Sequence, residues 1–149
     1  MKKIITALTA FVITVMCITG CGGSSIDINT VSNGVLTGVT FAEQLQQTSE
    51  KIALKRLGIN EADIEECVAF TSTNAVVDEF AIVKASNIDN VTAAIDAHIA
   101  NQISTYESYA PDEVAKLKDA IVKTVGDYVI YVVSSDSAMA QSVVDSLVK

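Results

Sequence analysis

The sequence has no tryptophan, one histidine, one proline and three cysteines among its 149 residues. Without an indole ring to stack on a sugar, a carbohydrate-binding face has little support. The single histidine, His98, could bind a metal only together with carboxylates, and neither Asp96 nor Glu107 lies three or four residues from it. We therefore expect His98 to be a structural or solvated residue beside the apolar stripe of a helix.

Positive charge is also scarce. Ten Lys and Arg residues stand against 18 Asp and Glu residues, which gives a net charge of −8. A surface of this sign repels phosphate backbones and anionic headgroups, so we expect no binding to nucleic acid. No serine stands in a nucleophile-elbow pattern and no glycine-rich loop follows a strand, so nothing indicates a catalytic serine or a phosphate site. We expect no cofactor.

The first 21 residues have the pattern of a lipoprotein leader. Lys2 and Lys3 precede an apolar run of about fifteen residues, which is too short for a membrane-spanning helix. The run ends in Ile18-Thr19-Gly20-Cys21, which resembles a bacterial lipobox. We expect cleavage before Cys21 and a diacylglyceryl group on its thiol, which would anchor the protein in membrane lipid on the outer face of the cytoplasmic membrane. An uncleaved anchor, or secretory cleavage without lipid, are the alternatives.

The chain then divides into three parts. Residues 1–20 form the expected signal peptide, residues 21–39 a lipidated flexible tether rich in Gly, Ser, Asn and Thr, and residues 40–149 a single domain. Because Cys17 leaves with the leader and Cys21 carries lipid, only Cys67 remains and no internal disulfide can form. Cys67 lies in an apolar run, so we expect a buried and inert thiol.

Periodicity in the domain predicts an α+β fold with a small, mostly antiparallel sheet of three strands and about four helices, in the order αββααβα. Thr40 with Glu43 resembles a capping box that begins a helix ending before Gly58. The polar turn between the first two strands predicts a β-hairpin. The last strand is apolar on both faces and is therefore expected to be covered on both sides or to lie centrally. The expected helices are 41–57, a long helix that residues 86–90 open and that runs to Tyr106, 111–125, and a last helix capped by Ser135 or Asp136. The expected strands are 62–71, 76–85 and 128–133.

Acidic residues are densest in the expected hairpin, which carries Asp63, Glu65, Glu66, Asp78 and Glu79. Carboxylates that face each other across a hairpin could bind Ca²⁺ or share a proton, but their spacing matches no calcium loop. Neighbours on a strand also point to opposite faces, so at most half can converge. We expect a charged sheet surface that resists aggregation, with Glu79 the one most in need of a partner, such as Lys84 or a helix N-terminus.

Four tyrosines are expected to pack in the core with their hydroxyls reaching the surface, and the alternative is exposed rings that stack on a sugar or peptide. They are Tyr106, Tyr109, Tyr128 and Tyr131.

Three segments resemble a family of bacterial lipoproteins known as the domain-of-unknown-function 4358 family. They are Asp78-Glu79-Phe80-Ala81-Ile82-Val83-Lys84, Tyr109-Ala110-Pro111-Asp112-Glu113 and Val125-Gly126-Asp127-Tyr128-Val129. The resemblance covers residues 41–149 and implies an extracytoplasmic lipoprotein of a Gram-positive cell. It implies no activity and no functional residue other than Cys21.

Two functions remain open. The first is a non-enzymatic binding or scaffold module of the cell envelope, whose partner would be another envelope protein, a wall component or a small ligand. Membrane anchoring would raise its local concentration and so favour weak binding. The second is a small hydrolase or metal-dependent enzyme that uses Glu66, Asp78 or Glu79 of the hairpin. A solute-binding protein is less well supported, because the chain has residues for one lobe only.

Overall fold

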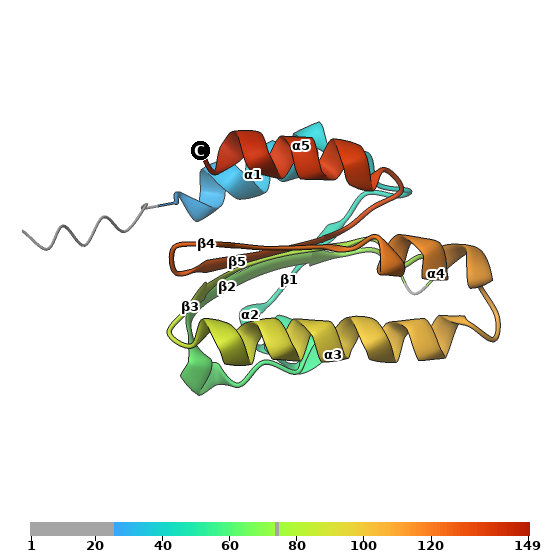
Figure 1. Ribbon diagram of the computed structural model, residues 1–149, viewed down its shortest axis with the longest axis horizontal. Helices are drawn as coiled ribbons and strands as arrows, with labels where there is room; N and C mark the ends of the chain where they lie inside the picture. Colours follow the sequence, from blue (N-terminus) through green and yellow to red (C-terminus); the bar gives the residue numbers. More distant parts are fainter. Residues whose placement is uncertain (1–25, 74) are drawn as a thin grey trace, which may run out of the picture.

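The computed structural model describes residues 26–73 and 75–149. They form a five-stranded antiparallel sheet in the order β1-β2-β3-β5-β4, with helices on both faces (Figure 1). The elements are α1 (Ile28–Gly38), β1 (Gln46–Thr48), α2 (Glu50–Leu57), η1 (Glu61–Asp63, a 3₁₀ turn), β2 (Ile64–Thr71), β3 (Glu79–Ala85), α3 (Ile88–Tyr106), α4 (Pro111–Lys118), β4 (Ile121–Val125), β5 (Tyr128–Val133) and α5 (Ser137–Leu147).

The predicted α+β class is confirmed, but the numbers of strands and helices are wrong. The described residues contain five strands and five α-helices, where three and about four were expected. The β2–β3 hairpin is present as predicted, and β5 pairs with β3 on one side and with β4 on the other. All six residues of β5 are buried, in agreement with its apolar sequence on both faces.

The expected helix over 41–57 is wrong in its first half. Leu45 is buried on the α1 and α5 face of the sheet, whereas Leu54 is buried on the opposite face. A single helix cannot reach both faces, and β1 carries the chain across the edge of the sheet between them. Glu43 does not cap a helix, because its carboxylate accepts a hydrogen bond from the backbone N–H of Thr73.

The expected helix over 111–125 divides in the same way. Leu117 in α4 packs on the α2 and α3 face, but Ile121 packs on the other face and begins β4. Gly126 and Asp127 form the two-residue loop of a β4–β5 hairpin, and Gly126 has a φ of +56°, which glycine adopts without steric cost. Within the expected helix, the apolar residues Val114 and Leu117 therefore belong to α4, whereas Ile121 and Val125 belong to β4.

Part of the expected tether is a helix. Asp27 caps α1 through the backbone N–H of Thr30, and Val31 and Val35 are buried against the sheet and α5. Gly34 and Gly38 lie one turn apart on the side that meets α5, where a Cβ at Gly34 would come within 2.5 Å of Leu147. The absence of side chains there lets α1 and α5 pack closely. The expectation of a flexible segment is therefore wrong for residues 28–38, where the glycines allow α1 to pack closely against α5.

The sheet separates two apolar clusters (Figure 1). Alternate residues of β3 and β5 point to opposite sides, so Ala81 and Tyr131 face α2 and α3 while Phe80 and Ile130 face α1 and α5. No helix within residues 26–73 and 75–149 is long and apolar enough to span a membrane. The expected signal peptide and Cys21 lie outside the described residues.

Candidate functional site

Asp78, directly before β3, and Glu79, the first residue of β3, are both almost fully buried, with exposed fractions of 0% and 1%. The expectation of a charged sheet surface is therefore wrong for these two residues. It holds for Glu65 and Glu66 on β2, which are exposed. A buried carboxylate needs hydrogen bonds or opposite charge to offset the loss of water, and each of the two has its own set of partners.

Glu79 is held by three side chains from three elements. Arg56 in the last turn of α2 donates from Nε to Oε1 over 2.6 Å, and His98 in the middle of α3 donates from Nε2 to Oε2 over 2.8 Å. The hydroxyl of Tyr131 on the neighbouring strand β5 donates to Oε2 over 3.3 Å. Both carboxylate oxygens are therefore satisfied, and the network joins the sheet to α2 and α3.

The environment keeps Glu79 ionised. Burial alone would raise its pKa, but hydrogen bonding and electrostatic attraction from His98 and Arg56 outweigh this effect, so the pKa lies below the ordinary value of 4.5. Burial, together with the nearby charge of Glu79, raises the pKa of Tyr131 well above 10. Tyr131 thus stays protonated and remains a donor, and His98 must carry its proton on Nε2 because an ionised carboxylate can only accept.

A groove between α2 and α3 lies over this network. It has a volume of about 410 Å³ and is lined by Lys55, Arg56, Leu57, Gly58, Ala94, Ala97, His98, Asn101 and Gln102. The side chain of Arg56 is 32% exposed, whereas His98 is 8% exposed. Arg56 and His98 therefore connect the groove to the buried carboxylate beneath it. This groove, with Glu79 below it, is the candidate site.

The second buried carboxylate, Asp78, connects helix α4 to the loop that precedes β1. It accepts hydrogen bonds from the backbone N–H of Ala42 and from Lys116 Nζ, the latter over 3.1 Å. Lys116 also pairs with Glu113, which accepts a hydrogen bond of 2.9 Å from the backbone N–H of Val77. These contacts satisfy the Asp78 carboxylate and join three segments of the chain, so we assign Asp78 a structural role.

The carboxylates of the hairpin do not meet in one site. Asp78 and Glu79 bind different partners, and Glu66 is exposed on β2. Lys84 pairs with Glu65 on β2, so the suggestion that Lys84 is the partner of Glu79 is wrong. Among the described residues, no group of three or more His, Cys, Asp and Glu side chains could hold a metal ion.

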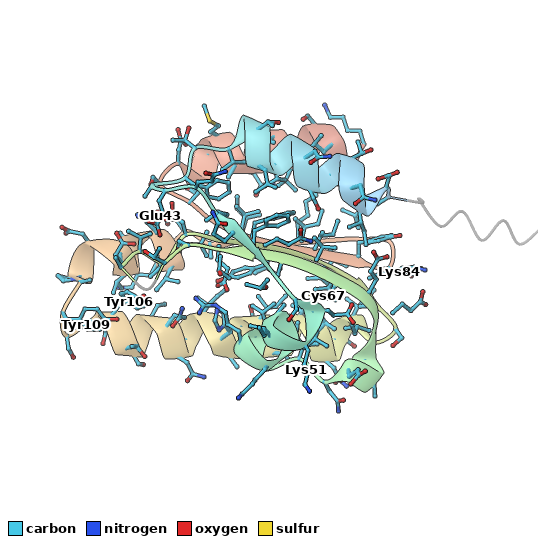
Figure 2. All side chains as sticks on the ribbon, turned by 180° about the vertical axis from the view of Figure 1, so that it is seen from behind. Glu43, Lys51, Cys67, Lys84, Tyr106 and Tyr109 are labelled. Carbon is cyan, nitrogen blue, oxygen red and sulfur yellow. The ribbon has the colours of Figure 1, made fainter. Side chains whose placement is uncertain are left out.

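Cys67 is buried, as predicted, on the sheet face that carries α2 (Figure 2). Burial, with a smaller effect of the Glu50 carboxylate, raises the pKa of its thiol to about 12. The thiolate is the nucleophilic form of cysteine, so this thiol is inert near neutral pH.

The tyrosines differ from one another. Tyr106, Tyr128 and Tyr131 are buried, as expected, but the hydroxyl of Tyr131 contacts Glu79 instead of reaching the surface. Tyr109 is 63% exposed, and its ring centroid lies 5.0 Å from that of Tyr106 at the end of α3 (Figure 2).

Sequence reasoning singled out Glu79 but missed what holds it. Arg56 was not among the candidate residues, and His98 was expected only as a structural or solvated residue beside an apolar stripe. Their separations from Glu79, 23 and 19 residues, match no helix or strand neighbour spacing. The one signal available was Glu79 itself, an ionisable residue directly before the apolar run Phe80-Ala81-Ile82-Val83.

A family model described as a domain of unknown function (DUF4358) matches residues 39–134, more than half of the chain. The matched segment runs from the end of α1 to the end of β5, and it includes every residue of the candidate site. Searches of curated proteins and of solved structures gave no match.

Proposed function

Because the chain belongs to the DUF4358 family, whose description names no activity, we propose a function from its own residues. The protein is an extracytoplasmic binding domain that lipid on Cys21 anchors to the membrane, and its ligand binds in the groove between α2 and α3.

The binding proposal depends on the arrangement of Arg56 and His98 above Glu79. Glu79 uses one nitrogen of each side chain. The two terminal nitrogens of Arg56 have no hydrogen-bond partner among the described residues, and neither has Nδ1 of His98. Both residues line the groove. The side chain of Arg56 is 32% exposed, so its terminal nitrogens can meet a ligand in the groove. Polar groups fixed in advance at a groove lose little entropy on binding, which favours a ligand site there.

The short distance in sequence between Cys21 and α1 supports an orientation of the domain on the membrane. Helix α1 begins at Ile28, so seven residue steps separate it from Cys21, and even a fully extended chain spans about 25 Å over that length. Helix α1 has no charged residue and α5 has one, Asp145. We propose that this weakly charged layer faces the bilayer, where few carboxylates would meet anionic headgroups, and that the groove faces away from it.

The anchor is tested by expressing the full chain in a bacterial host and separating membranes from soluble material. We expect the native chain in the membrane fraction with an acylated Cys21 by mass spectrometry, and a Cys21→Ser variant outside that fraction. Cys17→Ser is the matched control, because it changes the same residue type inside the apolar run without touching the lipobox. Retention of Cys21→Ser equal to that of the native chain would remove the lipid from this proposal.

The binding site is tested by photocrosslinking in intact cells. A photoreactive residue at Asn101 in the groove should yield a defined adduct by mass spectrometry, whereas the same residue at Lys118, which is exposed on α4 outside the groove, should not. Equal adducts at both positions would contradict a ligand site between α2 and α3. The alternative of a small enzyme built on the hairpin carboxylates gains nothing from the structure, since Glu66, Asp78 and Glu79 have no common site.

A further inference from the structure

The groove between α2 and α3 differs in charge from the rest of this acidic chain. No Asp or Glu lines it, while Lys55, Arg56, His98, Asn101 and Gln102 do. Four other grooves on the described surface each include at least one acidic residue: Glu43, Asp119, Glu50 with Glu61, and Asp27. In a chain with 18 acidic residues against ten basic ones, a groove free of carboxylates is a favourable place to accept an anion.

The hydrogen-bonding groups in the groove match a carboxylate. Arg56 is fixed through Nε, so its two terminal nitrogens form a planar fork that fits the two oxygens of a carboxylate. His98 is 8% exposed and is held by Glu79 through Nε2, and its Nδ1 has no hydrogen-bond partner among the described residues. When the ring carries a single proton, Nδ1 accepts a hydrogen bond, and an N–H next to the carboxylate of a ligand would supply it.

The local charge favours a monoanion over a dianion such as phosphate. The negative charge of Glu79 offsets one of the two cations, Lys55 and Arg56. The negative end of the α2 dipole also lies at Leu57 and Gly58, beside the groove. Ala94, which is half-buried, and Ala97, which is exposed, provide apolar surface for an uncharged body attached to the anion.

We propose that this groove binds a carboxylate carried on a small uncharged body, with Arg56 as the residue that contacts the carboxylate. The chemistry is shared by a small organic acid and by the free C-terminus of a peptide. This inference rests on the proposed function, because it names the ligand class of the same site.

The test is an NMR titration of the protein with N-acetyl-alanyl-alanine, its C-terminal carboxamide, acetate and inorganic phosphate, at constant ionic strength. We expect N-acetyl-alanyl-alanine to shift the backbone amide signals of Gly58, Ala97 and Asn101 in a saturable way. The carboxamide, which differs only in charge, should bind at least about tenfold more weakly, since hydrogen bonds to charged groups are the stronger ones. Acetate binding as tightly as the peptide would assign the site to the carboxylate alone, that is, to small organic acids. Weaker acetate binding would favour a peptide C-terminus.

Two matched pairs of variants separate the groove from general charge effects. Asn101→Asp adds a carboxylate to the exposed wall of the groove and should weaken binding about fivefold or more, whereas Asn33→Asp on α1 should not change it. Lys55→Gln should weaken binding, whereas Lys51→Gln removes the same charge from the same helix outside this groove and should leave the affinity unchanged. All four positions are exposed or partly exposed, so the variants should fold.

Three results would overturn the inference. Equal affinity for the carboxamide would show a groove that binds peptides without using the carboxylate, which leaves the proposed function intact and removes only the ligand class. Tighter binding of phosphate would assign the groove to dianions. The absence of any saturable shift with all four probes, together with no crosslinked adduct at Asn101, would remove both the ligand class and the site.

Discussion

Glu79 accepts a hydrogen bond of 2.8 Å from Nε2 of His98, and both residues are more than nine-tenths buried. One belongs to the second strand of a hairpin and the other to the middle of α3, so the bond connects the sheet to the helical layer that covers it. Arg56 on the opposite oxygen of the same carboxylate connects α2 in the same way. A single acidic side chain thus fixes the two walls of the groove.

Replacement of Glu79 by Gln should lower the free energy of unfolding by about 1–3 kcal/mol. The change keeps the shape of the side chain but removes the charge that Arg56 and His98 face. We expect less than the cost of breaking a fully buried pair, because Arg56 is 32% exposed and can regain water. Urea unfolding measures the effect. Glu65→Gln, which breaks the exposed pair with Lys84, is the control and should lower the free energy of unfolding by less, because solvent screens that pair.

The contribution of Glu79 should disappear in acid. Its pKa is lower in the folded chain than its ordinary value of 4.5, so the unfolded chain binds more protons as the pH falls. The stabilisation is therefore complete above about pH 4.5 and is lost as the pH falls from there through the folded pKa. Urea unfolding of the native chain and of Glu79→Gln between pH 3 and pH 7 should give curves that converge at the acid end. A constant difference would show that ionisation of Glu79 is not the cause.

Replacement of Val35 by Ala should lower the free energy of unfolding by about 2 kcal/mol, because the lost methyl groups leave a space in the core between α1 and the sheet. Asn33→Ala, on the exposed side of the same helix, should change it by less than about 0.5 kcal/mol. Thermal and urea unfolding provide the measurement. Equal and negligible effects would mean that α1 is a tether and contributes nothing to the fold.

Cys67 should resist alkylation in the folded protein. Burial raises the pKa of its thiol to about 12, so at pH 8 almost no thiolate is present, and the side chain is also shielded from the reagent. In a Cys17→Ser, Cys21→Ser double variant, Cys67 is the one remaining thiol. Iodoacetamide should label it slowly in buffer and rapidly in 8 M urea, as followed by mass spectrometry. Rapid labelling in buffer would contradict the buried position.

The sequence by itself determined the features that depend on near neighbours. The β2–β3 hairpin, the all-apolar β5, the helix α3 and the buried Cys67 follow from patterns read over a few residues, and their physical basis is local periodicity and burial. The Gly126-Asp127 loop was a further local signal, flanked on both sides by β-branched residues, that would have predicted the β4–β5 hairpin.

Only the tertiary structure decided where segments with the same periodicity lie. The residues from 41 to 57 and from 111 to 125 have helical spacing, but Leu45 and Ile121 contact one face of the sheet while Leu54 and Leu117 contact the other. The apolar periodicity of a segment predicts which of its residues are buried, but it does not predict which face of the sheet they pack against. The candidate site depends on the same information, since Arg56, His98 and Glu79 become neighbours only after two helices pack on one side of the sheet. The hydrogen bonds among these three side chains form only at short distance in the folded chain, so no spacing in the sequence predicts them.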